Sequence, residues 1–185
     1  MKNIYKARKI EDFRDLINYS AKRYSSRNAF ILRADNGKFR KIKYKELKDR
    51  YYSLCSYFIS QGLKGKSIAV VGANSYEWTV CYLAAATVGV AVPLDRELDA
   101  EDIMNFIKHA ECKALCADGK ILSRLAFKAE CDFEIYSFED VDKKYSLLSC
   151  DRLEEIKAIE ICKDETSALI FTSGTTGSAK GVCLS

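Results

Sequence analysis

Ten residues near the end of the chain combine side chains that suit the binding of phosphate groups. Residues 172–181 read TSGTTGSAKG and contain three glycines, five hydroxyl side chains and one lysine. Glycines allow the backbone to turn sharply and to approach a polyanion closely. Free backbone N–H groups and hydroxyls can donate to phosphate oxygens, and a lysine adds a compact positive charge. A plain polar hairpin loop is the alternative, but such a loop is usually shorter and rarely so rich in hydroxyls.

Two common nucleotide-binding patterns do not fit this segment. The Walker A loop requires a glycine, four residues and then Gly-Lys followed by Ser or Thr. Here Lys180 follows Ala179 and precedes Gly181, so the pattern fails on both sides of the lysine. The dinucleotide pattern Gly-x-Gly-x-x-Gly fails in this segment and also at residues 72–74. The loop therefore needs another explanation, and the apolar runs on both sides predict that strands flank it.

The elements that would position this loop alternate between strands and helices. Short apolar runs predict buried strands, and apolar residues at three- and four-residue steps predict helices. We predict strands at 67–72, 91–94, 114–117, 133–136 and 166–171, and helices at 13–24, 44–61, 76–88, 100–110 and 120–128. Ser75 and Asp99 are expected to cap two helices and Gly62 to end a third. The alternation indicates an α/β fold, a largely parallel sheet flanked by helices, whereas residues 140–161 fit neither pattern clearly.

A two-stranded hairpin is predicted before this alternation begins. Residues 29–32 form an apolar run, residues 35–37 suit a turn, and residues 39–44 alternate apolar with basic side chains. The densest basic run of the chain lies here and comprises Lys38, Arg40, Lys41, Lys43, Lys45 and Lys48. We interpret these residues as the solvated face of a strand and of a helix start. Contact with an anionic surface is the alternative.

The composition is that of an ordinary globular protein, with 48% hydrophobic and 30% charged residues. The net charge of +4 is too small to indicate a nucleic acid partner. No apolar run reaches the roughly 20 residues of a membrane span. The N-terminus has no signal-peptide pattern, so we expect a cytoplasmic protein whose membrane association is at most peripheral.

The cysteines and the single histidine do not predict a metal centre or a disulfide framework. Eight cysteines are scattered through apolar or helical stretches without a C-x-x-C pair. We expect them to be reduced and mostly buried, acting as small apolar residues. His109 is expected to be a partly exposed residue near a helix end, since no serine or cysteine partner pattern lies nearby.

The segment at 172–181 closely resembles the phosphate loop of the adenylate-forming superfamily. That superfamily includes acyl-CoA synthetases, luciferases and the adenylation domains of peptide synthetases. Its loop has a Ser/Thr-rich stretch, Gly-Thr-Thr-Gly, a small residue and Pro-Lys-Gly, with Ala179 here in place of the proline. The matching residues are Thr172, Ser173, Gly174, Thr175, Thr176, Gly177, Lys180 and Gly181. Upstream, residues 74–78 and 88–95 resemble bacterial long-chain acyl-CoA synthetases in particular, although Tyr76 and Trp78 also suit the core side of a helix.

The resemblance implies a two-step reaction that uses ATP, Mg²⁺ and coenzyme A. A carboxylate attacks the α-phosphate of ATP to give an acyl-adenylate and pyrophosphate, and a thiol such as coenzyme A then takes the acyl group. The resemblance also assigns roles within the loop. Hydroxyls donate to the β- and γ-phosphates, glycines allow close backbone approach, and Lys180 holds the pyrophosphate end.

The resemblance further implies that residues 1–185 are an incomplete N-terminal AMP-binding domain, the first portion of the large domain of such an enzyme. Family members carry a magnesium-binding glutamate and an essential lysine further along, so we expect no catalytic residue here and no acyl-adenylate formation by this piece alone. The preferred function is that of an acyl-CoA synthetase fragment acting on a fatty acid. The alternatives are an enzyme that loads a carrier protein and a non-catalytic nucleotide- or partner-binding module. The reading frame beyond Ser185 would separate enzyme from module.

Overall fold

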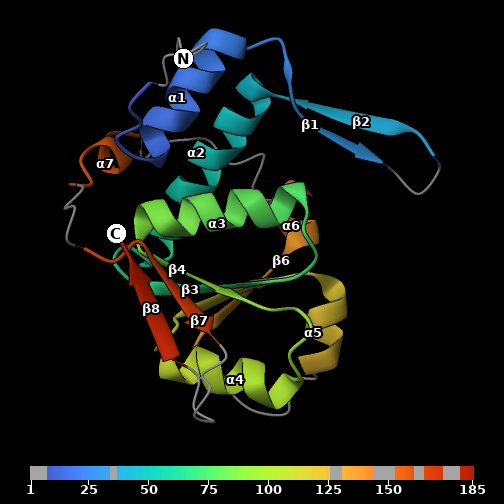
Figure 1. Cartoon of the computed structure of the whole chain (residues 1–185), viewed down its shortest axis with the longest axis vertical. Helices are drawn as coiled ribbons and strands as arrows, with labels where there is room; N and C mark the ends of the chain where they lie inside the picture. The colour runs from blue at the N-terminus through green and yellow to red at the C-terminus, as the bar shows by residue number, and fades with distance from the viewer. Residues whose placement is uncertain (1–7, 34–36, 126–130, 144–152, 161–164, 173–179) are drawn as a thin grey trace, which may run out of the picture. The chain divides into compact units, whose positions relative to one another are not determined.

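The computed structural model describes residues 8–33, 37–125, 131–143, 153–160, 165–172 and 180–185 (Figure 1). The chain divides into two compact units, Met1–Lys48 and Asp49–Ser185. The smaller unit contains the predicted helix and hairpin, and the larger one contains the predicted alternation of strands and helices.

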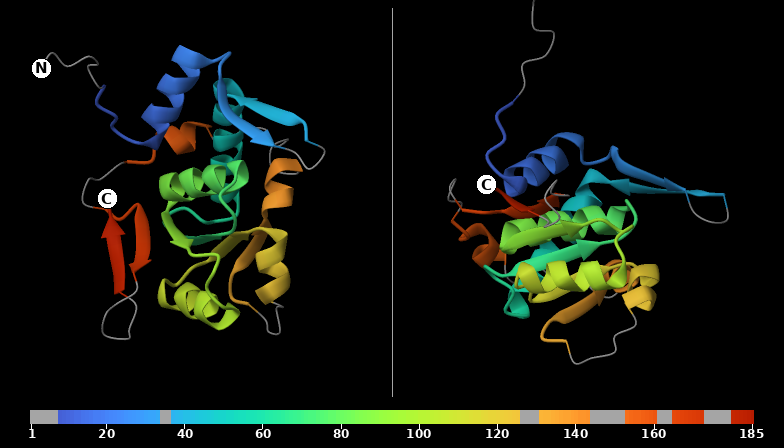
Figure 2. Two further views of the ribbon diagram at one scale, coloured as in Figure 1. Left: turned by 45° about the vertical axis from the view of Figure 1, so that its right-hand side comes forward. Right: turned by 60° about the horizontal axis from the view of Figure 1, so that its bottom comes forward.

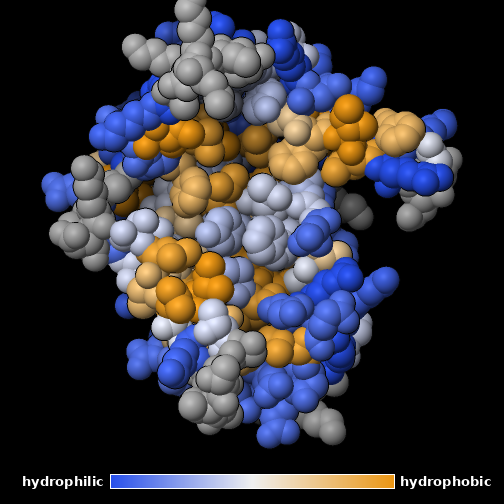
Figure 3. Space-filling view, in the orientation of Figure 1, coloured by the Kyte–Doolittle hydropathy of each residue, from blue (hydrophilic) through white to orange (hydrophobic). Residues whose placement is uncertain are grey.

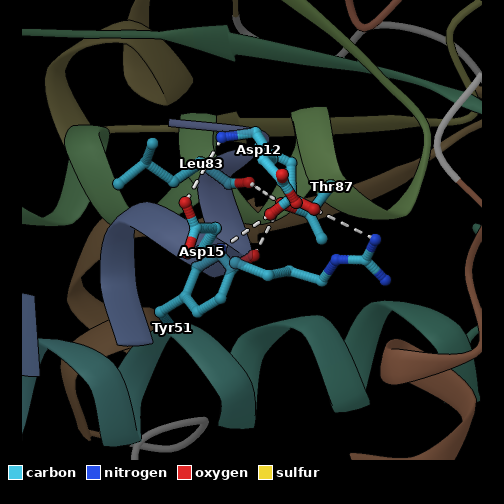
Figure 4. Close-up of polar contacts among 7 residues, drawn as sticks. Asp12, Asp15, Tyr51, Leu83 and Thr87 are labelled. Carbon is cyan, nitrogen blue, oxygen red and sulfur yellow. Dashed lines mark hydrogen bonds and ion pairs between the residues drawn. The ribbon is translucent and has the colours of Figure 1, made fainter. Parts of the chain in front are cut away.

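The smaller unit begins with helix α1, Phe13–Tyr24. Asp12 caps this helix, because its carboxylate accepts a hydrogen bond from the backbone N–H of Asp15 at 2.7 Å (Figure 4). Strands β1, Asn28–Arg33, and β2, Phe39–Lys43, then pair antiparallel. The predicted hairpin is therefore confirmed, and two of its predicted turn residues lie outside the described residues.

Helix α2, Tyr44–Ser60, starts in the smaller unit and continues into the larger one. Its apolar face includes Leu54, Cys55 and Phe58, all almost fully buried. The chain leaves the helix at Gly62, whose φ of +73° lies in the left-handed region that favours glycine. The N–H of Gly62 donates to the carbonyl of Ile59, as expected for the predicted helix end.

The larger unit is built on a sheet with the strand order β6-β5-β3-β4-β7-β8 in the described residues. The neighbouring pairs among the first five strands are parallel, and β8 runs antiparallel to β7. The strands are β3 Ser67–Val71, β4 Val90–Leu94, β5 Ala114–Ala117, β6 Glu134–Ser137, β7 Ala168–Thr172 and β8 Lys180–Leu184. The predicted α/β fold with a largely parallel sheet is confirmed.

Helices cover both faces of this sheet (Figures 1 and 2). Helix α3, Tyr76–Val88, lies on one face, and helices α4, Ala100–His109, and α5, Gly119–Leu125, lie on the other. A hydrophobic cluster lies between these two helices and the sheet. In it Ile103, Ile107 and Ile121 of the helices pack with Val71, Leu94 and Leu115 of the strands. Both predicted caps are confirmed, since Ser75 Oγ accepts from the N–H of Trp78 and an Asp99 carboxylate oxygen accepts from that of Asp102.

Residues 140–161, which fitted no clear pattern, contain the end of helix α6, Phe138–Lys143, and helix α7, Leu153–Lys157. Helix α5 ends at Leu125, and the last three residues of the predicted helix at 120–128 lie outside the described residues. None of the helices in the described part of the chain has the length and apolar character that crossing a bilayer needs.

A hydrogen-bonded pair of hydroxyls, from buried Tyr51 and half-buried Thr87, joins α2 to α3. Thr87 Oγ1 lies 2.8 Å from the carbonyl of Leu83, to which it donates, and 2.7 Å from the hydroxyl of Tyr51 (Figure 4). Because a threonine hydroxyl has a single proton, Tyr51 must be the donor to Thr87. Burial raises the pKa of Tyr51 further above its ordinary value, at which a phenol already carries the proton that this hydrogen bond needs.

Strand β7 is less buried than its apolar sequence predicts. Only Ala168 of this strand is buried, and every residue of β8 is exposed. The physical reason is position: β8 forms the edge of the sheet, and β7 is next to that edge. Two apolar side chains of β7, Leu169 and Phe171, are partly buried against the hydrophobic cluster between α4 and the sheet.

Cysteines mainly fill the core, as predicted. Cys55, Cys81, Cys112 and Cys116 are buried, and Cys131 is half-buried. Cys183 on the edge strand is exposed, which the sequence did not predict. All six described cysteines are free thiols, while Cys150 and Cys162 lie outside the described residues.

Candidate functional site

The predicted phosphate loop joins the last residue of β7 to the first residue of β8. Thr172 and Lys180 are opposite each other in the antiparallel ladder, and the Thr172 hydroxyl lies 3.4 Å from the carbonyl oxygen of Lys180. Both side chains are exposed. The other predicted binding residues, Ser173, Gly174, Thr175, Thr176 and Gly177, lie outside the described residues. The β7–β8 ribbon thus fixes the two ends of the loop next to each other.

The residues that flank the loop, Phe171 before it and Gly181 after it, are closely packed. The ring of Phe171, just before the loop, packs on Phe106 of α4 with 4.4 Å between centroids. His109, at the end of α4, also contacts this ring and is exposed, as predicted for a helix-end histidine. Gly181 pairs with Phe171 across the ladder, and a Cβ there would lie 2.9 Å from Leu169 Cδ1. A glycine at this position therefore lets β8 approach β7 closely.

The loop starts at the carboxyl edge of the sheet, where the chemistry of parallel α/β proteins usually occurs. Strands β3, β4 and β7 are parallel, so Val71, Leu94 and Thr172 end at the same edge. After β3 the chain crosses to the face covered by α3, and after the neighbouring β4 it crosses to the face covered by α4 (Figure 1). Adjacent strands whose connections diverge in this way leave a crevice between them.

A cleft of about 400 Å³ occupies this divergence point. One wall is the turn after β3, with Gly72, Ala73 and Asn74, and the other is the end of β4, with Leu94, Asp95 and Arg96. Trp78, in the first turn of α3, also lines the cleft. Its half-buried indole stacks on Tyr82 with 5.3 Å between centroids and 5° between planes, which fixes the ring orientation.

The first wall is held in place by Asp118, which directly follows β5. One Asp118 oxygen accepts from the N–H of Ala73 and the other from the N–H of Ile121 in α5, both at 2.9 Å. A Cβ on Gly72, whose φ is +158°, would lie 2.6 Å from Phe138 and 2.9 Å from Asp118. Only glycine allows the turn to pass this close to the carboxylate and the aromatic ring.

The second wall is ordered by short-range polar contacts. A carboxylate oxygen of Asp95 accepts from the N–H of Glu97 at 2.9 Å, and the Arg96 guanidinium pairs with the Glu97 carboxylate at the same distance. The backbone carbonyl of Arg96 accepts from Arg124 at 2.7 Å. The cleft therefore carries both an acidic and a basic side chain, and its rim can offer hydrogen bonds to a polar ligand.

The loop can be identified from the sequence, whereas the cleft cannot. In the sequence, residues 74–78 and 88–95 show only a family resemblance, and no pattern assigns a role to Asp95, Arg96 or Asp118. Their common signal is that each lies just beyond a predicted strand, where parallel strands bring polar residues to one edge. Tyr136 also lies near this edge, and burial raises its pKa further above the ordinary value, at which a phenol already keeps its proton at neutral pH.

Comparison with known proteins adds an independent observation to this geometry. A family model described as AMP-binding enzyme matches residues 17–185. The chain belongs to the AMP-binding enzyme family. The predicted resemblance to adenylate-forming enzymes is therefore confirmed.

A curated relative within the family is 2-succinylbenzoate–CoA ligase of Bacillus cereus (strain Q1). It is 31% identical over 146 residues, which cover 78% of this chain and 28% of that ligase. The chain therefore spans just over a quarter of the length of this relative.

Solved structures share the fold. The inhibitor-bound N-terminal domain of FACL13 from Mycobacterium tuberculosis superimposes with a TM-score of 0.77 at 19% identity, covering 94% of this chain and 44% of that one. The nonribosomal peptide synthetase FmoA3 gives a TM-score of 0.74 at 15% identity, covering 96% of this chain and 17% of that one. These similarities confirm the predicted fold, that of the N-terminal part of adenylate-forming enzymes.

Proposed function

We propose that this chain is the ATP-phosphate-binding part of an acid–CoA ligase. The complete enzyme would activate a carboxylic acid as its acyl-adenylate and then transfer the acyl group to coenzyme A. The observation that carries this proposal is the hydroxyl- and glycine-rich loop, whose two ends lie at the carboxyl edge of the sheet in a chain of the AMP-binding family. In this proposal residues 1–185 form the N-terminal portion of the AMP-binding domain.

The proposed chemistry requires positioning and charge neutralisation, because a carboxylate is already a nucleophile. The hydroxyls of Thr172, Ser173, Thr175 and Thr176 would donate to the β- and γ-phosphate oxygens, and Gly174 and Gly177 would let the backbone approach them. Lys180 would balance negative charge at the pyrophosphate end. Thr172 and Lys180 fit these roles because both are exposed and neighbouring. Mg²⁺ bound with ATP would supply further positive charge, and its ligands are expected outside this chain.

We propose a fatty acid as the substrate, with an aromatic acid as the second candidate. Resemblance of two upstream stretches to long-chain acyl-CoA synthetases supports the first. The second is supported by 31% identity to a ligase named for 2-succinylbenzoate. The two substrate classes differ in shape and charge, so direct comparison on one enzyme separates them.

The test uses the longest protein that carries this sequence. Pyrophosphate exchange into ATP would be measured with fatty acids of several lengths, 2-succinylbenzoate and amino acids, followed by thioester formation on coenzyme A or on a carrier protein. We expect exchange that depends on a fatty acid and a thioester that forms on coenzyme A. Transfer to a carrier protein alone would replace the ligase proposal by a loading enzyme. Nucleotide binding with no acid-dependent exchange would indicate a non-catalytic module.

A loop variant with a matched control tests the role of the lysine. Lys180→Ala should lower kcat/KM for ATP on the order of 100-fold, the usual effect of removing one transition-state donor. Lys113→Ala, which changes an exposed lysine just before β5, should leave the rate unchanged. Equal rates for Lys180→Ala and the parent enzyme would contradict the proposed role of Lys180. The 185-residue chain by itself is expected to form no acyl-adenylate.

A further inference from the structure

The β1–β2 hairpin exposes two large apolar side chains on a strongly basic ribbon. Ile31 is 60% exposed and Phe39 is 63% exposed, the highest values for large hydrophobic residues in the described part of the chain. Figure 3 shows hydrophobic and hydrophilic side chains next to each other over this hairpin. Exposed apolar side chains of this size are common singly, but here two of them lie on a ribbon that is also strongly basic.

The register of the hairpin places these side chains on one face. Ile31 is opposite Lys41, and Phe39 is opposite Arg33. Because side chains alternate between faces along a strand, Lys43 shares the face of Lys41. The opposite face carries Phe30, Leu32 and Ile42, of which Ile42 is fully buried. We name the outer face, made of Ile31, Arg33, Phe39, Lys41 and Lys43, the hairpin face.

Positive charge is concentrated around this face. Residues 28–48 contain seven lysines or arginines and two acidic residues, a net charge of +5. The whole chain carries only +4, so the remaining residues are slightly acidic in sum. The basic character of the chain is therefore local, and the two strands that carry much of it also carry the two exposed apolar side chains.

We propose that the hairpin face docks peripherally on an anionic lipid bilayer. The two apolar side chains would enter the interface, while the lysine and arginine head groups would pair with lipid phosphates. A protein partner fits less well, since a stable interface needs about 800 Å² and 20–30 residues on each side. The hairpin face has five side chains and no described groove. A lipid bilayer can bind such a small surface, because its headgroups make several weak contacts and need no complementary shape.

The basic run, which the sequence alone led us to interpret as a solvated face, thereby becomes part of a docking surface. The sequence alone showed the lysines, but it did not show that Ile31 and Phe39 point away from the core on the same side. An amphipathic helix is not required here, since the ribbon provides the same combination of apolar and cationic groups.

The test is co-sedimentation of the full chain with vesicles. Vesicles of phosphatidylcholine alone are compared with vesicles that contain about 30% phosphatidylglycerol, at low and at high salt. We expect the partition coefficient to rise at least about tenfold with the anionic lipid and to fall by a similar factor in high salt. Binding that is independent of anionic lipid would overturn the proposal, as would no binding to either vesicle.

Two double variants address the two parts of the hairpin face. The charge variant Lys41→Glu with Lys43→Glu should lower anionic-vesicle binding by at least about tenfold, because each cation near such a surface contributes about fivefold. The apolar variant Ile31→Ser with Phe39→Ser should also weaken binding about tenfold and should leave the salt dependence in place.

Matched controls change similar residues elsewhere. Lys64→Glu with Lys120→Glu makes the same change in net charge on exposed lysines of the larger unit. Val182→Ser with Leu184→Ser removes two apolar side chains that are 45% and 43% exposed. Circular dichroism confirms that each variant is folded. If the control pairs reduce binding as much as the hairpin pairs, the effect is not local and the proposal fails.

Discussion

Gly89 provides a quantitative test of how the sheet is assembled. This glycine separates α3 from β4, the strand whose other end forms a wall of the cleft. A Cβ placed on Gly89 would overlap the carbonyl oxygen of Lys66 and lie 2.9 Å from the Lys66 nitrogen. These are backbone atoms, so no side-chain rotation relieves the overlap. We expect Gly89→Ala to displace the start of β4 from β3.

The displacement breaks identifiable hydrogen bonds. The N–H of Val90 donates to the carbonyl of Lys66 at 3.0 Å, and the N–H of Gly65 donates to that of Val88 at 2.9 Å. The loss of both hydrogen bonds should lower the unfolding free energy by about 3 kcal/mol, because water reaches the freed backbone groups only in part. For a chain of this size that corresponds to a fall in Tm of about 10 °C.

The assay is urea unfolding followed by the fluorescence of Trp78, the only tryptophan and a residue of the same unit. Gly65→Ala is the matched control. Its Cβ would meet nothing within 4 Å, and only its φ of +71° disfavours alanine, which costs about 1 kcal/mol. The reasoning is wrong if Gly89→Ala is no more destabilising than Gly65→Ala, or if it lowers the unfolding free energy by less than about 1 kcal/mol.

Three further outcomes are expected. Tyr51→Phe removes one partly buried hydrogen bond and should lower the unfolding free energy by about 1 kcal/mol in the same urea assay. Asp118→Ala removes the acceptor of the Ala73 N–H, so hydrogen exchange at Ala73 should accelerate about tenfold, and unchanged exchange would contradict the tether. Iodoacetamide at pH 8 should label exposed Cys183 long before Cys112, as seen by peptide mass spectrometry, because burial raises the pKa of the Cys112 thiol to about 12.

Most of the fold could be predicted because local patterns and long-range packing agree. Ser75 and Asp99 cap helices by accepting hydrogen bonds from backbone N–H groups three residues later in the chain. Such short-range contacts can be predicted from a few consecutive residues. Residues 68–71 are all apolar because β3 lies between two strands and has helices on both faces of the sheet. Where burial depends on neighbours far along the chain, the prediction was weaker: β7 has the same kind of apolar sequence but lies close to the sheet edge.

The site was predictable only in part, for a related reason. The loop at 172–181 is a continuous motif, so its residue types identify it without a structure. The cleft is lined by residues that follow two different strands, β3 and β4, and one wall is held by Asp118, which follows a third. Nothing in the sequence states which strands are neighbours. The three-dimensional structure supplies that information. It places β4 beside β3, and the chain leaves these two strands toward opposite faces of the sheet, to α3 after β3 and to α4 after β4.

The pairing of β4 with β7 also has a consequence for how this protein is made. Ala91 of β4 pairs with Ala168 of β7, 77 positions later in the chain. At typical synthesis rates a ribosome needs roughly 4–15 s to make that stretch. During this time β4 has its β3 neighbour but an open edge on its other side, and open edges of this kind invite association with other chains. The strand that leads into the phosphate loop thus also covers the edge of β4 that stays open while these residues are made.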